Sequence, residues 1–139
     1  MRERYLYKAK RIDNGEWIEG YYQFYTYGYG SEDREGHIIR DGKSNLYFVD
    51  ESTICQCTGL KDINGNLIWE NDIVKISEHE YLVNGIYEVI YSEITFQWIL
   101  SRSIEYHYNS FNFSDLNGFY ETSEVIGNKF DNPELLEVE

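Results

Sequence analysis

The chain has 139 residues, 25 acidic and 12 basic, with a formal net charge of −13, and its length suits one domain with its own core. This charge argues against binding to a nucleic-acid backbone or to an anionic membrane, since both depend on Lys and Arg. A partner protein with a basic surface is more compatible with it.

The N-terminal third is predicted to form two β-hairpins. Alternating apolar and polar residues indicate a strand near residues 5–12 and another over 16–27, separated by a turn at Asp13-Asn14-Gly15. Residues 28–36 are rich in Gly and charged side chains, so we expect a mobile loop there. A second hairpin follows, with its turn at Asp41-Gly42.

Two Asn-Gly pairs predict further hairpin turns in the middle of the chain, at Asn64-Gly65 and Asn84-Gly85. Both central residues of a type I′ turn need positive φ, which Gly and Asn tolerate best. We therefore expect a two-residue turn of this type at each pair.

The C-terminal part adds more strands. Residues 86–100 are one long strand or two successive strands, and residues 105–120 give no clear pattern. A last strand ends near Ile126, and Asn132-Pro133 suits the start of a short helical turn. No amphipathic helix of 12 residues is evident, so the expected fold class is mostly β, a β-rich α+β fold with short helical turns only.

The alternation fails within residues 66–76, NLIWENDIVKI. A continuous strand would place the carboxylates of Glu70 and Asp72 on its apolar face. We therefore expect a tight turn or bulge there, with Asn71 as the residue at positive φ.

Three acidic residues in this region, Asp62, Glu70 and Asp72, are the weak candidates for a metal or general-base site. They lack the spacing of a calcium loop. The favoured interpretation is that Asp62 and Asp72 accept hydrogen bonds from backbone amides in their own turns. No catalytic residue, cofactor or metal site is therefore predicted.

The cysteines and histidines show no ligand spacing. Cys55 and Cys57 lack the partners of a zinc site and are interpreted as buried thiols in a reducing cytosol. His37, His79 and His107 are scattered. Neither an apolar run of membrane-spanning length nor a signal peptide is present, so a cytoplasmic location is expected.

Aromatic residues are unusually frequent, with 14 Tyr, 7 Phe and 3 Trp. Two sets, Tyr21–Tyr29 and Tyr106–Phe113, are interpreted first as core and next as an oligomer or partner interface. Base stacking usually needs a basic groove, and these segments contain almost no Lys or Arg. The expected partners are a basic protein and a second copy of the chain, with no nucleic acid and no membrane.

Two stretches resemble the signature segments of YopX-like proteins: residues 56–76, QCTGLKDINGNLIWENDIVKI, and residues 124–137, EVIGNKFDNPELLE. They occur in the expected order and bracket most of the chain. The family usually has Gly where this chain has Asn71, and Asn is the next residue to tolerate positive φ. The positions interpreted as structural turns are Gly59, Asn64, Gly65, Asn71, Gly127 and Pro133.

The resemblance implies a fold of several coiled antiparallel sheets that include a small Src-homology-3-like barrel. It also implies an origin in bacteriophages or prophages, and it brings no established function or catalytic residue. We expect a single domain over 1–139, with N-terminal hairpins over about 1–50, a barrel-like core over about 51–100 and a C-terminal strand and tail over about 119–139.

Three classes of function follow. The leading hypothesis is a non-enzymatic accessory protein that binds a basic partner, with mimicry of nucleic-acid charge as one version. The second is an enzyme or small-ligand binder that uses Asp62, Glu70 and Asp72. The third, direct binding of nucleic acid by the barrel, is weakened by the charge balance.

Overall fold

The computed structural model describes most of the chain, namely residues 2–27, 34–78, 84–94, 96–104, 107–112 and 122–137. The chain divides into two compact units, an N-terminal unit of Met1–Cys57 and a C-terminal unit of Thr58–Glu139. The single domain over 1–139, with its internal boundaries, stays a prediction.

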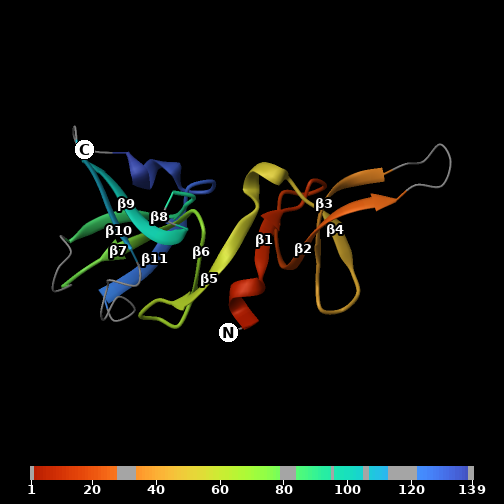
Figure 1. The fold of residues 1–139 in the computed structure, drawn as a ribbon, viewed down its shortest axis with the longest axis horizontal. Helices are drawn as coiled ribbons and strands as arrows, with labels where there is room; N and C mark the ends of the chain where they lie inside the picture. Colours follow the sequence, from red (N-terminus) through yellow and green to blue (C-terminus); the bar gives the residue numbers. More distant parts are fainter. Residues whose placement is uncertain are drawn as a thin grey trace. The chain divides into compact units, whose positions relative to one another are not determined.

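Strands dominate both units, and the described helical segments are short 3-10 helices (Figure 1). These are η1 (Arg2–Tyr5), η2 (Glu51–Thr53) and η4 (Pro133–Leu136). The expected mostly β fold, made of antiparallel sheets with short helical turns, is confirmed. The Src-homology-3-like barrel stays a prediction.

The N-terminal unit is an antiparallel sheet with the strand order β4-β3-β2-β1-β5. Both expected hairpins are present, as β1–β2 and β3–β4. Residues 28–33 of the expected mobile loop lie outside the described residues. The expectation is wrong for residues 34–36, which form the start of β3 and pair with β2. The strands are β1 (Tyr7–Lys10), β2 (Trp17–Tyr27), β3 (Arg34–Arg40), β4 (Leu46–Phe48) and β5 (Cys55–Lys61).

The hydrophobic cluster of the N-terminal unit lies on one face of this sheet, whereas Ile38, also buried, projects to the other face. Ala9, Ile39 and Val49 are buried in the cluster, and half-buried aromatic and aliphatic side chains surround them. A close approach of β2 to β3 requires Gly20, because a Cβ at this position would overlap the carbonyl oxygen of Arg40. Glycine therefore allows the long strand β2 to coil against its neighbour.

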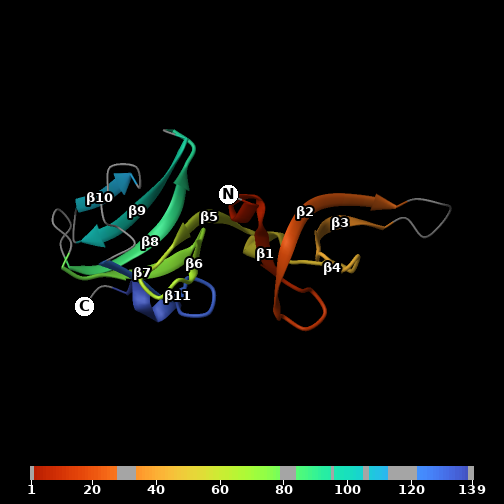
Figure 2. The ribbon, with the colours of Figure 1, turned by 90° about the horizontal axis from the view of Figure 1, so that it is seen from below.

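The C-terminal unit contains a five-stranded antiparallel sheet with the order β10-β9-β8-β7-β11 (Figure 2). β5 continues into this unit, where it hydrogen-bonds to β6. The run at 86–100 forms two strands rather than one. The strands are β6 (Leu67–Trp69), β7 (Asp72–Ile76), β8 (Gly85–Ser92), β9 (Gln97–Ile104), β10 (His107–Asn112) and β11 (Ser123–Asn128).

Alternate residues of these strands build the core of the C-terminal unit. The partly buried side chains of Trp98 and Val125 pack against this cluster, and η4 packs against β8. Cys55 and Cys57, in β5, are buried, as expected, and they form no disulfide. Among the described residues, no helix has the length and apolar content needed to cross a bilayer. The buried core residues are Ile68, Val74, Ile76, Tyr87, Val89 and Leu100.

The two-residue type I′ turns expected at Asn64-Gly65 and Asn84-Gly85 are both wrong. Gly85 is the first residue of β8 and pairs with Ile76, so Asn84-Gly85 ends a longer connection. Asn64-Gly65 belongs to a loop that has the same structure as the loop between β3 and β4. In the β5–β6 loop the N–H of Asp62 donates to the carbonyl of Asn66 at 2.8 Å, and the positive φ, 80°, is at Gly65 and not at Asn64. The β3–β4 loop, residues 41–45, is closed in the same way and has Ser44 at φ 70°. Each is a three-residue loop that ends on a left-handed residue.

Candidate functional sites

The carboxylate of Asp62 serves the backbone of two distant segments. The side chain is 4% exposed. Its Oδ1 accepts the N–H groups of Asn64 and Asn66, both at 2.9 Å, and its Oδ2 accepts the N–H of Val125 at 2.9 Å. Asp62 therefore holds its own loop closed and ties that loop to β11.

The buried carboxylate of Asp72 stabilises the next turn, between β6 and β7. Its Oδ2 accepts the N–H of Trp69 at 2.8 Å. Asn71 lies in this turn at φ 71°, and Glu70 precedes it with a half-buried side chain. In the described part of the chain, no three His, Cys, Asp or Glu side chains gather as metal ligands would. The structure thus does not assemble Asp62, Glu70 and Asp72 into a metal site.

The remaining turn residues of the two signature segments have local structural roles. Gly59 lies inside β5 rather than in a turn, with φ at 81°. A Cβ on Gly127 would overlap the side-chain amide of Asn132, whose Oδ1 accepts the N–H of Asn128 at 3.3 Å. Pro133 opens η4, where the missing N–H of proline costs nothing.

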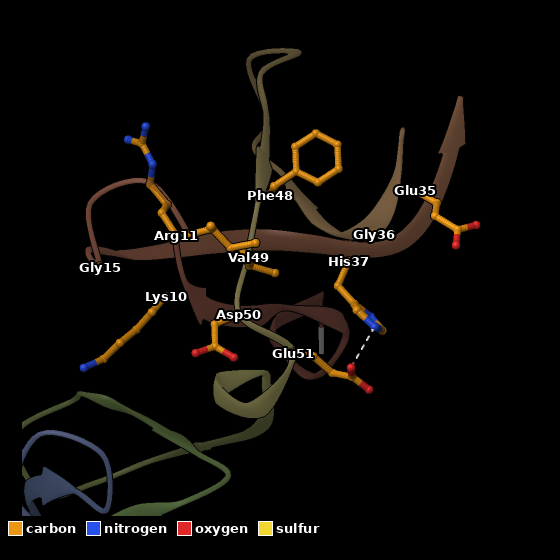
Figure 3. Close-up of a pocket in the computed structure, with 11 residues that line it drawn as sticks. Lys10, Arg11, Gly15, Glu35, Gly36, His37, Phe48, Val49, Asp50 and Glu51 are labelled. Atoms are coloured by element: carbon orange, nitrogen blue, oxygen red, sulfur yellow. Dashed lines mark ion pairs between the residues drawn. The ribbon is translucent and has the colours of Figure 1, made fainter. Parts of the chain in front are cut away.

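A pocket of about 630 Å³ in the N-terminal unit is lined in part by His37 (Figure 3). Nε2 of His37 lies 3.3 Å from Oε2 of Glu51, and the hydroxyl of Tyr22 hydrogen-bonds to Nδ1. With Nε2–H donating to Glu51, Nδ1 accepts from Tyr22. The pocket is lined by Lys10, Arg11, Ile12, Gly15, Glu35, Gly36, His37, Phe48, Val49, Asp50 and Glu51.

The hydrogen-bonded group of Tyr22, His37 and Glu51, of which the last two line the pocket, was missed in the sequence because its members come from separate elements. Tyr22 is on β2, His37 on β3 and Glu51 on η2. Local spacing carries no signal for them, since only the pairing of β2 with β3 brings the first two together. The lining contains cations, carboxylates and apolar residues, so its charge favours no single class of ligand. His79 lies outside the described residues, and His107 belongs to β10.

The hairpin between β8 and β9 exposes large apolar side chains. Ile94 is 90% exposed and Phe96 is 76% exposed. Phe96 has φ at 56°, a conformation that is rare for an aromatic residue. Next to this tip, the ring of Tyr91 meets the ring of Trp98 edge to face, with centroids 5.1 Å apart.

The charge of the chain is divided unevenly between the units. Residues 58–139 contain 15 acidic and four basic residues, a net charge of −11. Residues 1–57 contain ten acidic and eight basic residues, a net charge of −2. The acidity that the composition indicates for the whole chain therefore belongs almost entirely to the C-terminal unit.

The first aromatic set divides between core and surface. Tyr22 packs against the core of the N-terminal unit, whereas Tyr21 and Phe24 on the same strand are each 51% exposed. The second set, Tyr106–Phe113, lies outside the described side chains.

Comparison with known proteins agrees with the two signature segments. No curated protein matches the chain. The family model described as YopX protein matches residues 6–137, which include both segments and most of each unit. The chain therefore belongs to the YopX family.

Proposed function

We propose that the protein is a non-enzymatic binding module whose C-terminal unit docks on a partner protein with a basic surface. The observation that carries this proposal is the exposed apolar tip of the β8–β9 hairpin, formed by Ile94 and Phe96, on a unit with a net charge of −11.

The tip has the properties of an interface anchor. A single exposed apolar residue is ordinary, but two large ones at the end of one hairpin give that tip an exposed apolar surface. Phe96 also holds a positive φ that a residue selected only for the turn, Gly or Asn, would adopt without strain. An aromatic side chain kept there at this cost supports a role in contact.

The net charge of the unit that carries the tip supports the choice of partner. A net negative charge disfavours acidic surfaces and speeds encounter with basic ones. Such steering weakens as salt screens it, so binding to this unit should depend on ionic strength.

The buried carboxylates support a binding role over an enzymatic one. The oxygens of Asp62 and Asp72 accept backbone N–H groups within the fold, and a residue engaged in this way is poorly placed to bind a cation or take a proton. Membership of the YopX family supports an accessory role for a phage or prophage as the setting of this interaction.

The test compares tagged wild-type protein with an Ile94→Ser/Phe96→Ser variant, used as baits in cells that carry an induced phage, at low and high salt. The wild type should retain one dominant basic protein at low salt, and the variant should lose it. Ile63→Ser is the matched control, because Ile63 is in the same unit, is apolar and is 58% exposed. Equal retention by all three baits would refute the role of the tip.

The same samples test self-association by light scattering. A concentration-dependent dimer that the tip variant abolishes would make a second copy of the chain the partner, in place of a basic protein.

A further inference from the structure

One face of the N-terminal sheet gathers aromatic and cationic side chains from three strands. Lys10 pairs with Trp17 across β1 and β2, and Tyr21 pairs with Arg40 across β2 and β3. Paired residues of an antiparallel sheet project to the same face, as do alternate residues of one strand. The basic aromatic face is defined here as Lys8, Lys10, Trp17, Tyr21, Gln23, Tyr25 and Arg40.

The cations of this face are held against aromatic rings. Nζ of Lys8 lies 4.8 Å and Nζ of Lys10 5.4 Å from the ring centroid of Trp17. The Arg40 guanidinium lies 5.8 Å from the Tyr25 ring, and its Nε donates to Oε1 of Gln23 at 3.1 Å. These contacts hold the cationic groups close to the aromatic rings.

This face lies opposite the cluster of Ala9, Ile39 and Val49. Its own side also carries two buried residues, Ile38, which pairs with Gln23, and Cys55, which pairs with Lys8. The core residues Ala9 and Ile39 alternate with Lys8, Lys10 and Arg40 along the same strands and project to the other side of the sheet. On the basic aromatic face, Tyr21 is 51% exposed.

We propose that the basic aromatic face binds single-stranded nucleic acid. Proteins that bind single strands combine cations, which follow the phosphates, with aromatic rings on which bases stack. A duplex would not offer its base faces to these rings, and three cations would neutralise few of its phosphates. An acidic polypeptide could meet the cations but has no bases to stack on the rings.

The net charge of the chain does not oppose this proposal as strongly as composition alone implies. The N-terminal unit has a net charge of only −2, and the three cations of the basic aromatic face share it with Glu19, which pairs with Lys8. The cations come from β1 and β3, whereas the rings come from β2. This ligand is additional to the protein partner proposed for the C-terminal unit.

The number of cations fixes an expected salt dependence. Three phosphate contacts to a single strand give a slope of about −2 for log K against log salt concentration. Binding should therefore weaken about 16-fold between 50 and 200 mM salt.

The first experiment measures the fluorescence anisotropy of labelled 15-residue oligothymidine at 50 mM salt with the full chain. Tyr21→Ala should weaken binding about tenfold. Phe24→Ala should change it less than twofold, because Phe24 is on the same strand and equally exposed (51%) but projects to the opposite face. Thermal melts establish that both variants fold.

Charge variants provide a second, independent measurement. Lys8→Gln/Lys10→Gln should weaken binding and make the salt slope shallower by about 1.4. The control is Lys75→Gln, which removes an exposed cation of the C-terminal unit and should leave the slope unchanged.

Three results would overturn the proposal. The first is no binding of the oligonucleotide at 50 mM salt by the folded wild type. The second is an equal loss from Tyr21→Ala and Phe24→Ala. The third is competition by polyglutamate as effective as that by unlabelled oligothymidine, which would assign the basic aromatic face to an acidic polypeptide.

Discussion

Asp62→Asn is the most direct perturbation of the C-terminal unit. The substitution keeps the size of the side chain and changes one oxygen to an NH₂ group. The remaining oxygen can still accept the N–H groups of Asn64 and Asn66, as Oδ1 does in the wild type. The NH₂ group would then face the N–H of Val125, which donates to Oδ2 at 2.9 Å. Two donors would meet where a donor and a carboxylate now do.

The size of the effect follows from these bonds. A hydrogen bond to a charged group contributes about 1.5–3 kcal/mol, and a buried donor left without an acceptor costs about 1–3 kcal/mol. Asp62→Asn loses the hydrogen bond from Val125, and the acceptor of the other two hydrogen bonds is no longer charged. We therefore expect the free energy of unfolding to fall by about 2–3 kcal/mol.

The assay combines urea unfolding with hydrogen exchange of individual amides. Exchange should accelerate most at the amide of Val125. The control is Asp41→Asn: Asp41 accepts the N–H groups of Lys43 and Asn45 in the equivalent loop but has no described bond to a distant strand. A wild-type unfolding curve for Asp62→Asn, or equal effects of the two substitutions, would refute this role for Asp62.

Two further predictions concern backbone conformation and pH. Ser44→Gly should stabilise the protein by about 0.5–1 kcal/mol and Gly65→Ala should destabilise it by about 1 kcal/mol, because both positions have positive φ. Melting temperatures that shift in the same direction for the two variants would contradict this prediction. Burial raises the pKa of Glu88 and Lys129 partly opposes that shift, so the folded state binds this proton more tightly than the unfolded state. The Glu88→Gln variant should therefore be more stable than the wild type at pH 7. Urea titrations should show this difference in stability shrink as the pH falls through the raised pKa of Glu88. A difference that does not depend on pH would exclude this mechanism.

Much of the fold could be predicted because its signals are local. Period-two alternation located the strands, and the failed alternation at residues 66–76 indicated the break that Asn71 forms between β6 and β7. The type I′ expectation at Asn64-Gly65 was wrong because the pair belongs to a longer loop, in which the carboxylate of Asp62 organises the backbone. The Asn-Gly pair is compatible with either loop, and the residues before it decide between them.

Sequence by itself determined the family, the mostly β class and the break at Asn71, since each depends on patterns among near neighbours in the chain. Tertiary structure alone decided which distant groups meet. Asp62 and Val125 are 63 positions apart, and Tyr22, His37 and Glu51 come from three elements. The basic aromatic face likewise exists only because β1 and β3 place their cations beside the rings of β2. Strand order and register bring these groups together, and both depend on long-range pairing that no local pattern encodes.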